Sequence, residues 1–440
     1  MRSSSGGSAL AARLRALDPA LLLLAAMVFV VQVGVAVMLP LLPLYALSLG
    51  ASPFVLGLLT SVFAVTNAAG QLITGFLAER LPMRRLLAAG IGGYAVANFL
   101  IAGASTAGSL IAFRAFAGIG GGIMLVGERL YLVQIVDRTR LAYANGILSA
   151  AGSAGSVLGP AIGGLLASLA DLRLPFLLVG VTSLLATVGA LFLPKPKSDV
   201  PEVVQAAVGE ADSPPAAAAP RAAAPPPAAA PPPAPHAGGK AHSDRRRLGI
   251  LLLAQIALMS GFGAFITTYG PFAEQRLGWP TAEIGLVFAL FGLGAIVFGP
   301  WLGRQADLRG RRTVAVLSTL PVIVFAVVYW LEAPRLLLYA ASIAAGAGVT
   351  GVTASWYALL ADATEGGRRG RRFGTVAALG NLGIVLGATV AAQLWELLDD
   401  VGVGFVIAGI SVAVCALAFM ILPRDRSTGT DTTTAPQPSA

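Results

Sequence analysis

Three charged side chains lie inside one long apolar run of the sequence, and two of them, Arg114 and Glu128, are the first candidates for chemistry within a membrane. Glu128 is the most deeply embedded of the 21 acidic residues, and Arg114 precedes it by 14 residues. On a helix this spacing is nearly four turns, so both side chains point to a similar face about 21 Å apart. Charges within membrane segments usually face the protein interior and mark pathways or proton relays. Glu128 and Arg114 are therefore candidates for proton coupling.

Glu128 can act as a proton carrier if its surroundings change. Apolar burial favours the protonated carboxyl and a nearby arginine favours the carboxylate, so a carboxyl that alternates between the two loads and releases a proton. Two structural alternatives stay open. Glu128 could form an ion pair with an arginine at the end of its helix, where Arg129 follows it in sequence, and Arg114 could extend its charge towards the membrane surface.

The composition indicates a membrane protein rather than an enzyme. The chain has 440 residues, of which 56% are hydrophobic and only 12% charged, a balance typical of proteins with many membrane helices. Cys415 is the single cysteine, and His236 and His242 fall in a low-complexity segment, so we expect no disulfide and no metal site. No G-x-x-x-x-G-K-[ST] motif occurs. We expect no enzyme activity, no resident cofactor and no nucleic-acid partner.

Apolar runs of about 20 residues, the length that crosses a bilayer, predict an all-α integral membrane fold of twelve helices. The first run, after Pro19, is too long for the core of a signal peptide, so we expect it to remain as a helix. The expected helices lie near 20–47, 53–79, 84–105, 108–135, 141–169, 174–194, 248–274, 280–306, 312–332, 334–362, 372–397 and 401–422.

The helices divide into two bundles of six, at residues 20–194 and 248–423. Residues 195–247 contain a stretch rich in proline and alanine that predicts a disordered linker. Residues 1–19 and 424–440 are polar end segments. Most of the 30 lysine and arginine residues fall in the end segments, the linker and alternate loops, whereas the opposite loops hold only three, Arg173, Arg276 and Arg335. The positive-inside rule then places both termini and the linker in the cytoplasm.

The two halves of the chain are similar at an offset of 228 residues. Gly50 falls on Gly278 and Gly57 on Gly285, and further coincidences continue along the chain. These further pairs are Gly75 with Gly303, Glu79 with Asp307, Gly118 with Gly346, Gly120 with Gly348, Gly146 with Gly374, Gly155 with Gly383 and Gly159 with Gly387. The offset predicts a duplication, with two parallel repeats of six helices.

A glycine-rich segment from Gly146 to Gly164, GILSAAGSAGSVLGPAIGG, lies in the fifth apolar run. Gly155, Gly159 and Gly163 recur every four residues, so on a helix they form a stripe that lets a second helix approach closely. Pro160 removes a backbone donor and favours a bend. Tight static packing and a moving interface are both compatible with this pattern.

The spacing of Gly146, Gly155, Gly159, Pro160, Gly163 and Gly164 resembles the fifth-helix antiporter motif of the major facilitator superfamily. In that superfamily the motif marks the twelve-helix drug:proton antiporter branch. The resemblance implies proton-coupled efflux, with this helix at the interface between the two halves.

Two loops resemble the superfamily signature G-x-x-x-D-[RK]-x-G-[RK]-[RK]. The stretch from Gly75 reads GFLAERLPMRR, with Glu79 in place of the aspartate, and the stretch from Gly303 reads GRQADLRGRR. The resemblance implies that Glu79 latches the eleventh helix near Arg372, and that Asp307 latches the fifth near Arg140. The alternative is that the loops are basic only to set topology. The candidate gate residues in these loops are Gly75, Glu79, Arg80, Arg84, Gly303, Asp307, Gly310 and Arg311.

Arg114 also belongs to a resemblance. RAFAGIG resembles the superfamily's fourth-helix motif R-x-x-Q-G-x-G, with Ala117 at the glutamine position. Many drug:proton antiporters carry an acid in the first helix, where this chain offers only Gln32. Other polar or aromatic residues in helices expected to line the central cavity are Gln32, Tyr45, Asn67, Gln71, Gln255, Tyr269, Trp356, Tyr357 and Asn381. Trp356 and Tyr357 could stack on rings or cations.

From the residues and the resemblance together we expect a multi-pass plasma-membrane transporter that works by alternating access as a monomer. The leading hypothesis is export of small, largely hydrophobic, drug-like molecules driven by the proton gradient, as in multidrug resistance. Uptake or facilitated diffusion of a small metabolite is the first alternative. A membrane interaction protein that keeps the fold without transport is the second.

Overall fold

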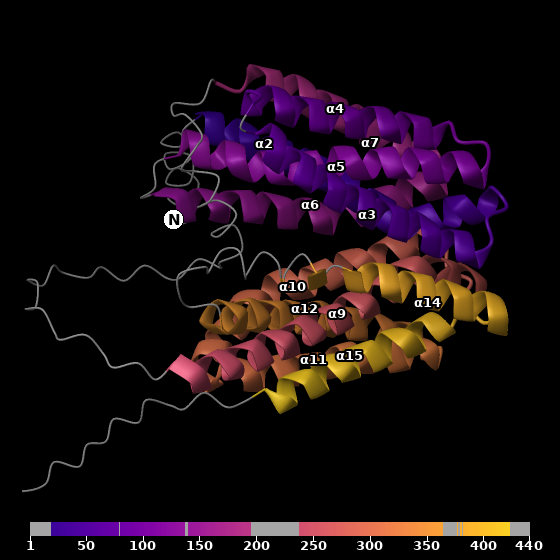
Figure 1. Cartoon of the computed structure of the whole chain (residues 1–440). Helices are drawn as coiled ribbons and strands as arrows, with labels where there is room; N and C mark the ends of the chain where they lie inside the picture. Colours follow the sequence, from indigo (N-terminus) through magenta and orange to yellow (C-terminus); the bar gives the residue numbers. More distant parts are fainter. Residues whose placement is uncertain are drawn as a thin grey trace, which may run out of the picture.

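The computed structural model describes residues 19–78, 80–136, 140–194, 237–363, 376, 379–380 and 382–422, with the side chains of 142 and 237–245 excepted. These residues form twelve α-helices (Figure 1). The helices are α2 (Pro19–Ser48), α3 (Pro53–Leu77), α4 (Met83–Ala102), α5 (Ala107–Ile135), α6 (Leu141–Leu169), α7 (Leu174–Phe192), α9 (Ala237–Gln275), α10 (Thr281–Arg309), α11 (Arg311–Trp330), α12 (Arg335–Ala363), α14 (Leu382–Leu398) and α15 (Val403–Ile421).

The helices have the length and composition of membrane spans. Eleven are long and apolar enough to cross a bilayer, and α14 is a shorter apolar helix within the described residues. A helix satisfies its own backbone hydrogen bonds, which is the condition for crossing hydrocarbon. The prediction of an all-α integral membrane fold is confirmed.

The helices pack as two bundles that lie one against the other (Figure 1). The first, α2 to α7, packs through the helix pairs α2/α6, α3/α5, α4/α5 and α4/α7. The second, α9 to α15, packs through α9/α14, α9/α15, α10/α12, α11/α12 and α11/α15. Two pairs join the bundles most extensively, α6 with α10 and α3 with α14. We call these the α6/α10 seam and the α3/α14 seam.

The internal repeat is visible in the packing of its glycines. A methyl group at Gly118 would meet the carbonyl oxygen of Phe63, and one at Gly346 would meet that of Phe291, which is the equivalent residue at the 228-residue offset. Gly50 and Gly278 have φ angles of 77° and 64°. Both end the turn after the first helix of their bundle, in a conformation that glycine adopts without strain. The duplication expected from the sequence therefore exists in three dimensions.

The two ends of the molecule differ. At one end, which we call the joined end, lie the turns at 49–52, 103–106, 170–173, 276–280, 331–334 and 399–402. There a single hydrophobic core contains residues of both bundles, including Val37, Tyr45, Phe265 and Tyr269.

At the other end, the divided end, the core splits. One cluster holds only residues of the first bundle, such as Leu87 and Tyr131. Another holds only residues of the second bundle, such as Leu251 and Trp356. Among the described residues the bundles are thus joined at one end and separate at the other, which is the geometry of one state of an alternating-access transporter.

The linker boundary expected at residue 247 differs from the structure. Helix α9 begins at Ala237, within the predicted linker, although its membrane-spanning part begins near the expected place, at Arg246. The last proline of the linker is Pro235, so the first turns of α9 contain no residue that lacks the amide donor a helix needs. The other predicted end and linker segments, and the start of the helix predicted at 372–397, lie outside the described residues.

Candidate functional site

Arg114 lies in the interior of the first bundle. Its side chain is 8% exposed, and its guanidinium carbon lies 3.9 Å from the centre of the Phe63 ring on α3. Its Nη1 approaches the sulfur of Met38 on α2 at 4.0 Å, and Nε is buried without a hydrogen-bond partner. In the described part of the chain, no carboxylate pairs with Arg114. The ring of Phe63 stabilises the charge inside the bundle. Arg114 therefore does not extend its charge towards the membrane surface, which was the structural alternative.

Glu128 lies on the same helix in the half of the molecule near the divided end. It is half-buried, and within the described residues its carboxylate has no hydrogen-bond or ion-pair partner. Arg129 points instead to α6, where its Nη1 donates to Oδ1 of Asn145 at 3.3 Å. The structural ion pair considered for Glu128 therefore does not form with Arg129. A membrane-embedded acid without a fixed partner is free to exchange a proton.

Of three polar residues in the first bundle, Gln32 and Asn67 connect neighbouring helices, and Gln71 supports Asn67 from its own helix α3. Gln32 Nε2 donates to Ser156 Oγ at 2.9 Å, which links α2 to α6. Asn67 donates to the carbonyl oxygen of Gly118 at 3.4 Å and accepts from Gln71 at 2.8 Å. All three side chains keep partial exposure.

Three aromatic residues predicted to line the cavity instead lie in packed interiors. Tyr45 is 2% exposed and donates to the carbonyl oxygens of Ala102 and Ala104. Tyr269 is fully buried and donates to Ile284 O at 3.3 Å. Their hydroxyl groups cap backbone carbonyls at the joined end, so their cavity assignment is corrected for the state in which that end is closed.

Trp356 is the third correction. It is 1% exposed, and its indole nitrogen donates to Leu251 O at 2.8 Å. Tyr357 packs against it with ring centres 5.0 Å apart, and this pair belongs to the core of the second bundle. Buried aromatic residues with a polar group commonly find such a partner. Trp356 therefore presents no face to a ligand, while Tyr357 keeps partial exposure.

Gln255 and Asn381 complete the set expected to line the cavity. Gln255 is buried on α9, and its Oε1 has no hydrogen-bond partner. An unpaired buried amide oxygen is costly, so a donor group of a ligand would satisfy it. Asn381 lies outside the described residues.

The glycine-rich helix α6 packs on a different helix with each of two faces. A methyl group at Gly155 would lie 2.7 Å from the carbonyl oxygen of Phe29, and Gly159 and Gly163 also pack on the backbone of α2. Pro160 and Gly164 face the other bundle, where they contact Gly285 of α10. The predicted stripe thus packs within its own bundle, and the residues beside it form the interface between halves. A methyl group added at Gly146, near the divided end, would meet nothing within 4 Å.

Polar contacts between the bundles were not expected from the sequence. Thr60 and Thr267 share a hydrogen bond of 3.3 Å, and Ser61 and Thr389 share one of 3.1 Å. Thr281 donates to the carbonyl oxygen of Gly164 at 3.1 Å. Glu396 of α14 accepts hydrogen bonds from Ser52 and Phe54. All these contacts lie in the joined half, and single hydroxyl groups in apolar runs give no signal of their partners.

The signature loops lie at the divided end. Glu79 and Arg372 are outside the described residues. Asp307 and Arg140 are both exposed, and no described contact joins them. Gly75 and Gly303 would meet nothing within 4 Å if given a methyl group, and Gly310 forms a turn with φ of 92°. The latch implied by the resemblance stays a prediction for the state in which this end closes.

The arginines of these loops bind helix ends within their own bundles. Arg84 Nη1 donates to Leu193 O, at the end of α7, at 3.0 Å. Its repeat equivalent Arg312 donates to Met420 O near the end of α15, and Arg311 binds Ala358 O and Asp362 at the end of α12. Arg80 is exposed. Cations at carboxyl ends complement the helix dipole, a role that the sequence did not reveal.

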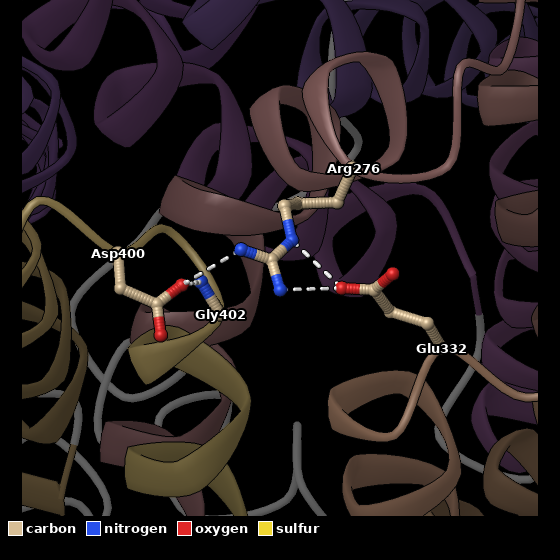
Figure 2. Close-up of polar contacts among 4 residues, drawn as sticks. All are labelled: Arg276, Glu332, Asp400 and Gly402. Atoms are coloured by element: carbon tan, nitrogen blue, oxygen red, sulfur yellow. Dashed lines mark hydrogen bonds and ion pairs between the residues drawn. The ribbon is translucent and has the colours of Figure 1, made fainter.

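The joined end of the second bundle carries a charge cluster (Figure 2). Arg276 Nη2 lies 2.6 Å from Glu332 Oε1, and Nη1 lies 3.8 Å from Asp400 Oδ1. The same Asp400 oxygen accepts from the backbone of Gly402 at 2.8 Å. The hydrogen bond and charge of Glu332 raise the pKa of Arg276. The cluster ties together three turns of one bundle.

The helix order, the duplicated packing and the two seams define a membrane transporter of the twelve-helix type. The family model of the Major Facilitator Superfamily matches residues 24–280 and 251–439. The chain belongs to this superfamily, whose members are transporters and not enzymes. It is thus a multi-pass membrane protein that carries a small-molecule substrate.

Curated relatives match a limited part of the chain. The quinolone resistance protein NorA of Staphylococcus aureus is 28% identical over 38% of this chain and 42% of its own length. An uncharacterized MFS-type transporter of Methanocaldococcus jannaschii is 29% identical over 36% of this chain and 42% of its own. The alignments thus span less than half the length of these relatives.

Solved structures match nearly the whole fold. The nucleoside transporter NupG superimposes with a TM-score of 0.71 and 13% identity, over 92% of this chain and 99% of its own. A bacterial homolog of the human lysosomal transporter Spinster, in an inward-facing and occupied conformation, gives a TM-score of 0.71 at 14% identity over 91% and 96%. At these identities the similarity establishes the fold.

Proposed function

We propose that this protein exports small, largely hydrophobic, drug-like molecules in exchange for protons by alternating access. The proposal rests chiefly on the position of Glu128, a half-buried acid without a described partner, in the half of the molecule where the bundles are divided. From there it can exchange a proton with the medium that enters between the bundles. When the joined end opens and the divided end closes, the same carboxyl faces the opposite side.

Arg114 complements this role from the sealed half. Its buried charge is compensated by the Phe63 ring rather than by an acid, so a change of state can bring other groups to it without first breaking an ion pair. We assign Glu128 as the proton carrier and Arg114, about 21 Å away on the same helix, as a fixed positive charge of the same transport pathway. The proton gradient then takes the place of a cofactor.

The substrate class rests on the chemistry of the exposed polar groups and on one relative. Gln32, Asn67, Gln71 and Tyr357 are neutral and half-buried, which suits weakly charged ligands with a few hydrogen-bonding groups. The name of NorA describes a quinolone resistance protein, which supports drug-like compounds as substrates. We place the divided end, with the basic loops, in the cytoplasm of a plasma-membrane protein, in agreement with the positive-inside rule.

The test is drug accumulation in cells that lack their own exporters. Cells expressing the wild-type chain should accumulate less of at least one compound of a broad panel, and an uncoupler should abolish the difference. Glu128→Gln should raise accumulation to the level of the uncoupled cells, because the amide cannot carry a proton.

Glu274→Gln is the matched control. Glu274 is an exposed acid on α9 next to the joined end, so its replacement should leave export unchanged. Normal export by Glu128→Gln would remove Glu128 as the carrier. Absence of export over the whole panel would favour uptake of a metabolite, which radiolabelled nucleosides and other metabolites would then test.

A further inference from the structure

We propose that Glu396 is a reversible latch that holds the joined end shut, by capping the first turn of α3 from the opposite bundle. The proposal rests on the alternating-access transport proposed above. It assigns to Glu396 a positioning role: the residue touches no substrate, and it sets how readily the two bundles separate at this end.

The contact consists of two hydrogen bonds to one carboxylate oxygen. The backbone N–H of Phe54 donates to Glu396 Oε2 at 2.9 Å, and Ser52 Oγ donates to the same oxygen at 3.4 Å. Helix α3 begins at Pro53, and Ser52 at its N-cap makes no capping hydrogen bond with its own side chain. The first N–H groups of a helix need an external acceptor, and here a residue of the second bundle supplies it.

The negative charge of Glu396 stabilises α3, whose first turn it caps, and destabilises its own helix, α14. Glu396 lies near the carboxyl end of α14, which ends at Leu398. A carboxylate is destabilised at a helix carboxyl end and stabilised at an amino end. The acid therefore gains its compensation only while the two bundles are together, so the interaction favours the joined state.

Among the described residues, the latch occurs in one seam only. The residue equivalent to Glu396 at the 228-residue offset is Ser168, which donates to Leu165 O of its own helix at 2.7 Å. In that α6/α10 seam the end contact is the neutral hydrogen bond from Thr281 to Gly164. A duplication explains the shared helices but not an acid on one side, so Glu396 is an addition specific to the α3/α14 seam.

The exposure of Glu396 suits a contact that must break in every cycle. The side chain is exposed to solvent at the molecular end, so separation of the bundles returns the carboxylate to water instead of leaving a buried charge. Exposed charged contacts contribute little energy. The latch should therefore bias the equilibrium without locking it.

The test measures how often the joined end opens, by the reaction of a buried cysteine with a maleimide in lipid nanodiscs. Thr267→Cys is the reporter, because Thr267 is fully buried and meets Thr60 of the other bundle at 3.3 Å. The background is Cys415→Ala, which removes the single native thiol. Nanodiscs expose both faces, so the assay needs neither a known orientation nor a substrate.

Glu396→Ala should raise the labelling rate of Thr267→Cys about two- to fivefold. Glu396→Gln should have a smaller effect, because its amide oxygen still accepts from Phe54 but carries no charge. Glu332→Gln is the matched control: it removes an acid at the same end whose partner, Arg276, belongs to its own bundle (Figure 2). That control should leave the labelling rate unchanged.

A second thiol separates gating from loss of structure. In the chain that retains Cys415 and Thr267, Cys415 is fully buried within the second bundle and should stay unreactive in Glu396→Ala. An unchanged rate at Thr267→Cys, or an equal rise at Cys415, would overturn the latch. If the labelling result holds while no compound is exported, the latch stands and the proposed export function fails.

Discussion

The two seams between the bundles share one framework and differ in chemistry. In the α6/α10 seam Gly285 packs on Pro160 and Gly164, and in the α3/α14 seam its equivalent Gly57 packs on Ala388 and Ala392. These partners are themselves equivalent at the 228-residue offset. At these positions the first seam brings backbone against backbone, whereas in the second Gly57 meets the methyl group of Ala392 as well as the backbone carbonyl of Ala388.

The polar contacts follow the same division. The α3/α14 seam has a hydroxyl pair, Ser61 with Thr389, and the charged cap of Glu396. The α6/α10 seam has the single described hydrogen bond from Thr281 to Gly164. Close steric fit therefore occurs in both seams, and the α3/α14 seam adds polar contacts to it. Steric contacts tolerate little change, while exposed polar contacts can be tuned by small amounts.

The largest effect is expected for Gly285→Ala in the α6/α10 seam. The added methyl group would collide with the carbonyl of Pro160 and lie 3.2 Å from Gly164 Cα. These are backbone atoms that cannot rotate away, and overpacking of this kind costs about 1–3 kcal/mol. Because the collision exists only when the bundles are joined here, we expect faster labelling of Thr267→Cys, by about 30-fold for a cost at the middle of that range, and impaired export.

Gly108→Ala is the control near the joined end, on α5. A methyl group at Gly108 meets nothing within 4 Å, so labelling should stay at the wild-type value. If Gly285→Ala labels and exports like the wild type, then α6 and α10 do not approach as closely as the structure places them.

An intermediate effect is expected for Thr389→Val in the α3/α14 seam. Valine keeps the shape of threonine but cannot pair with Ser61, whose side chain is buried in the joined half. An unpaired buried hydroxyl costs about 1–3 kcal/mol, so labelling of Thr267→Cys should rise several-fold. The double variant Ser61→Ala/Thr389→Val leaves no unpaired group, and its rate should return part of the way to wild type. A rate in the double variant equal to the product of the single effects would show that the pair does not couple the bundles.

The sequence predicted the architecture because the signals were periodic and duplicated. Apolar runs gave the helices, and the constant offset predicted glycine pairs such as Gly50 with Gly278, which adopt the same backbone conformation. The antiporter-type spacing correctly placed α6 at the interface between halves. It did not show that Gly155, Gly159 and Gly163 face α2 while Pro160 and Gly164 face α10, because one helix has several small-residue faces and sequence does not reveal which neighbour meets each.

The residues expected to line the cavity were predicted less well. Tyr45, Tyr269 and Trp356 were chosen as polar aromatics within apolar runs, but such residues also cap carbonyl groups inside a bundle. Glu396 was not predicted from the sequence to join the bundles. An acid at a helix end resembles an ordinary solvated charge, and its partner lies 342 residues away in the chain, in another bundle.

The smallest effect is expected for Arg276→Gln, which breaks the charge cluster of Figure 2 without touching either seam. The groups are exposed, so the melting temperature should fall only slightly, and the difference should shrink at high salt because salt screens exposed charges. Glu332 raises the pKa of Arg276, so the stabilisation is complete below the ordinary pKa of arginine and is lost only as the pH rises through the higher folded value. Between about pH 6 and pH 9 the difference from wild type should therefore be constant.

Thermal unfolding of Arg276→Gln at low and high salt measures the loss of stability, and labelling of Thr267→Cys should not change. A rise in labelling would show that the charge cluster also stabilises the contact between the bundles. Contacts within the second bundle and contacts between the bundles would then not be independent at this end.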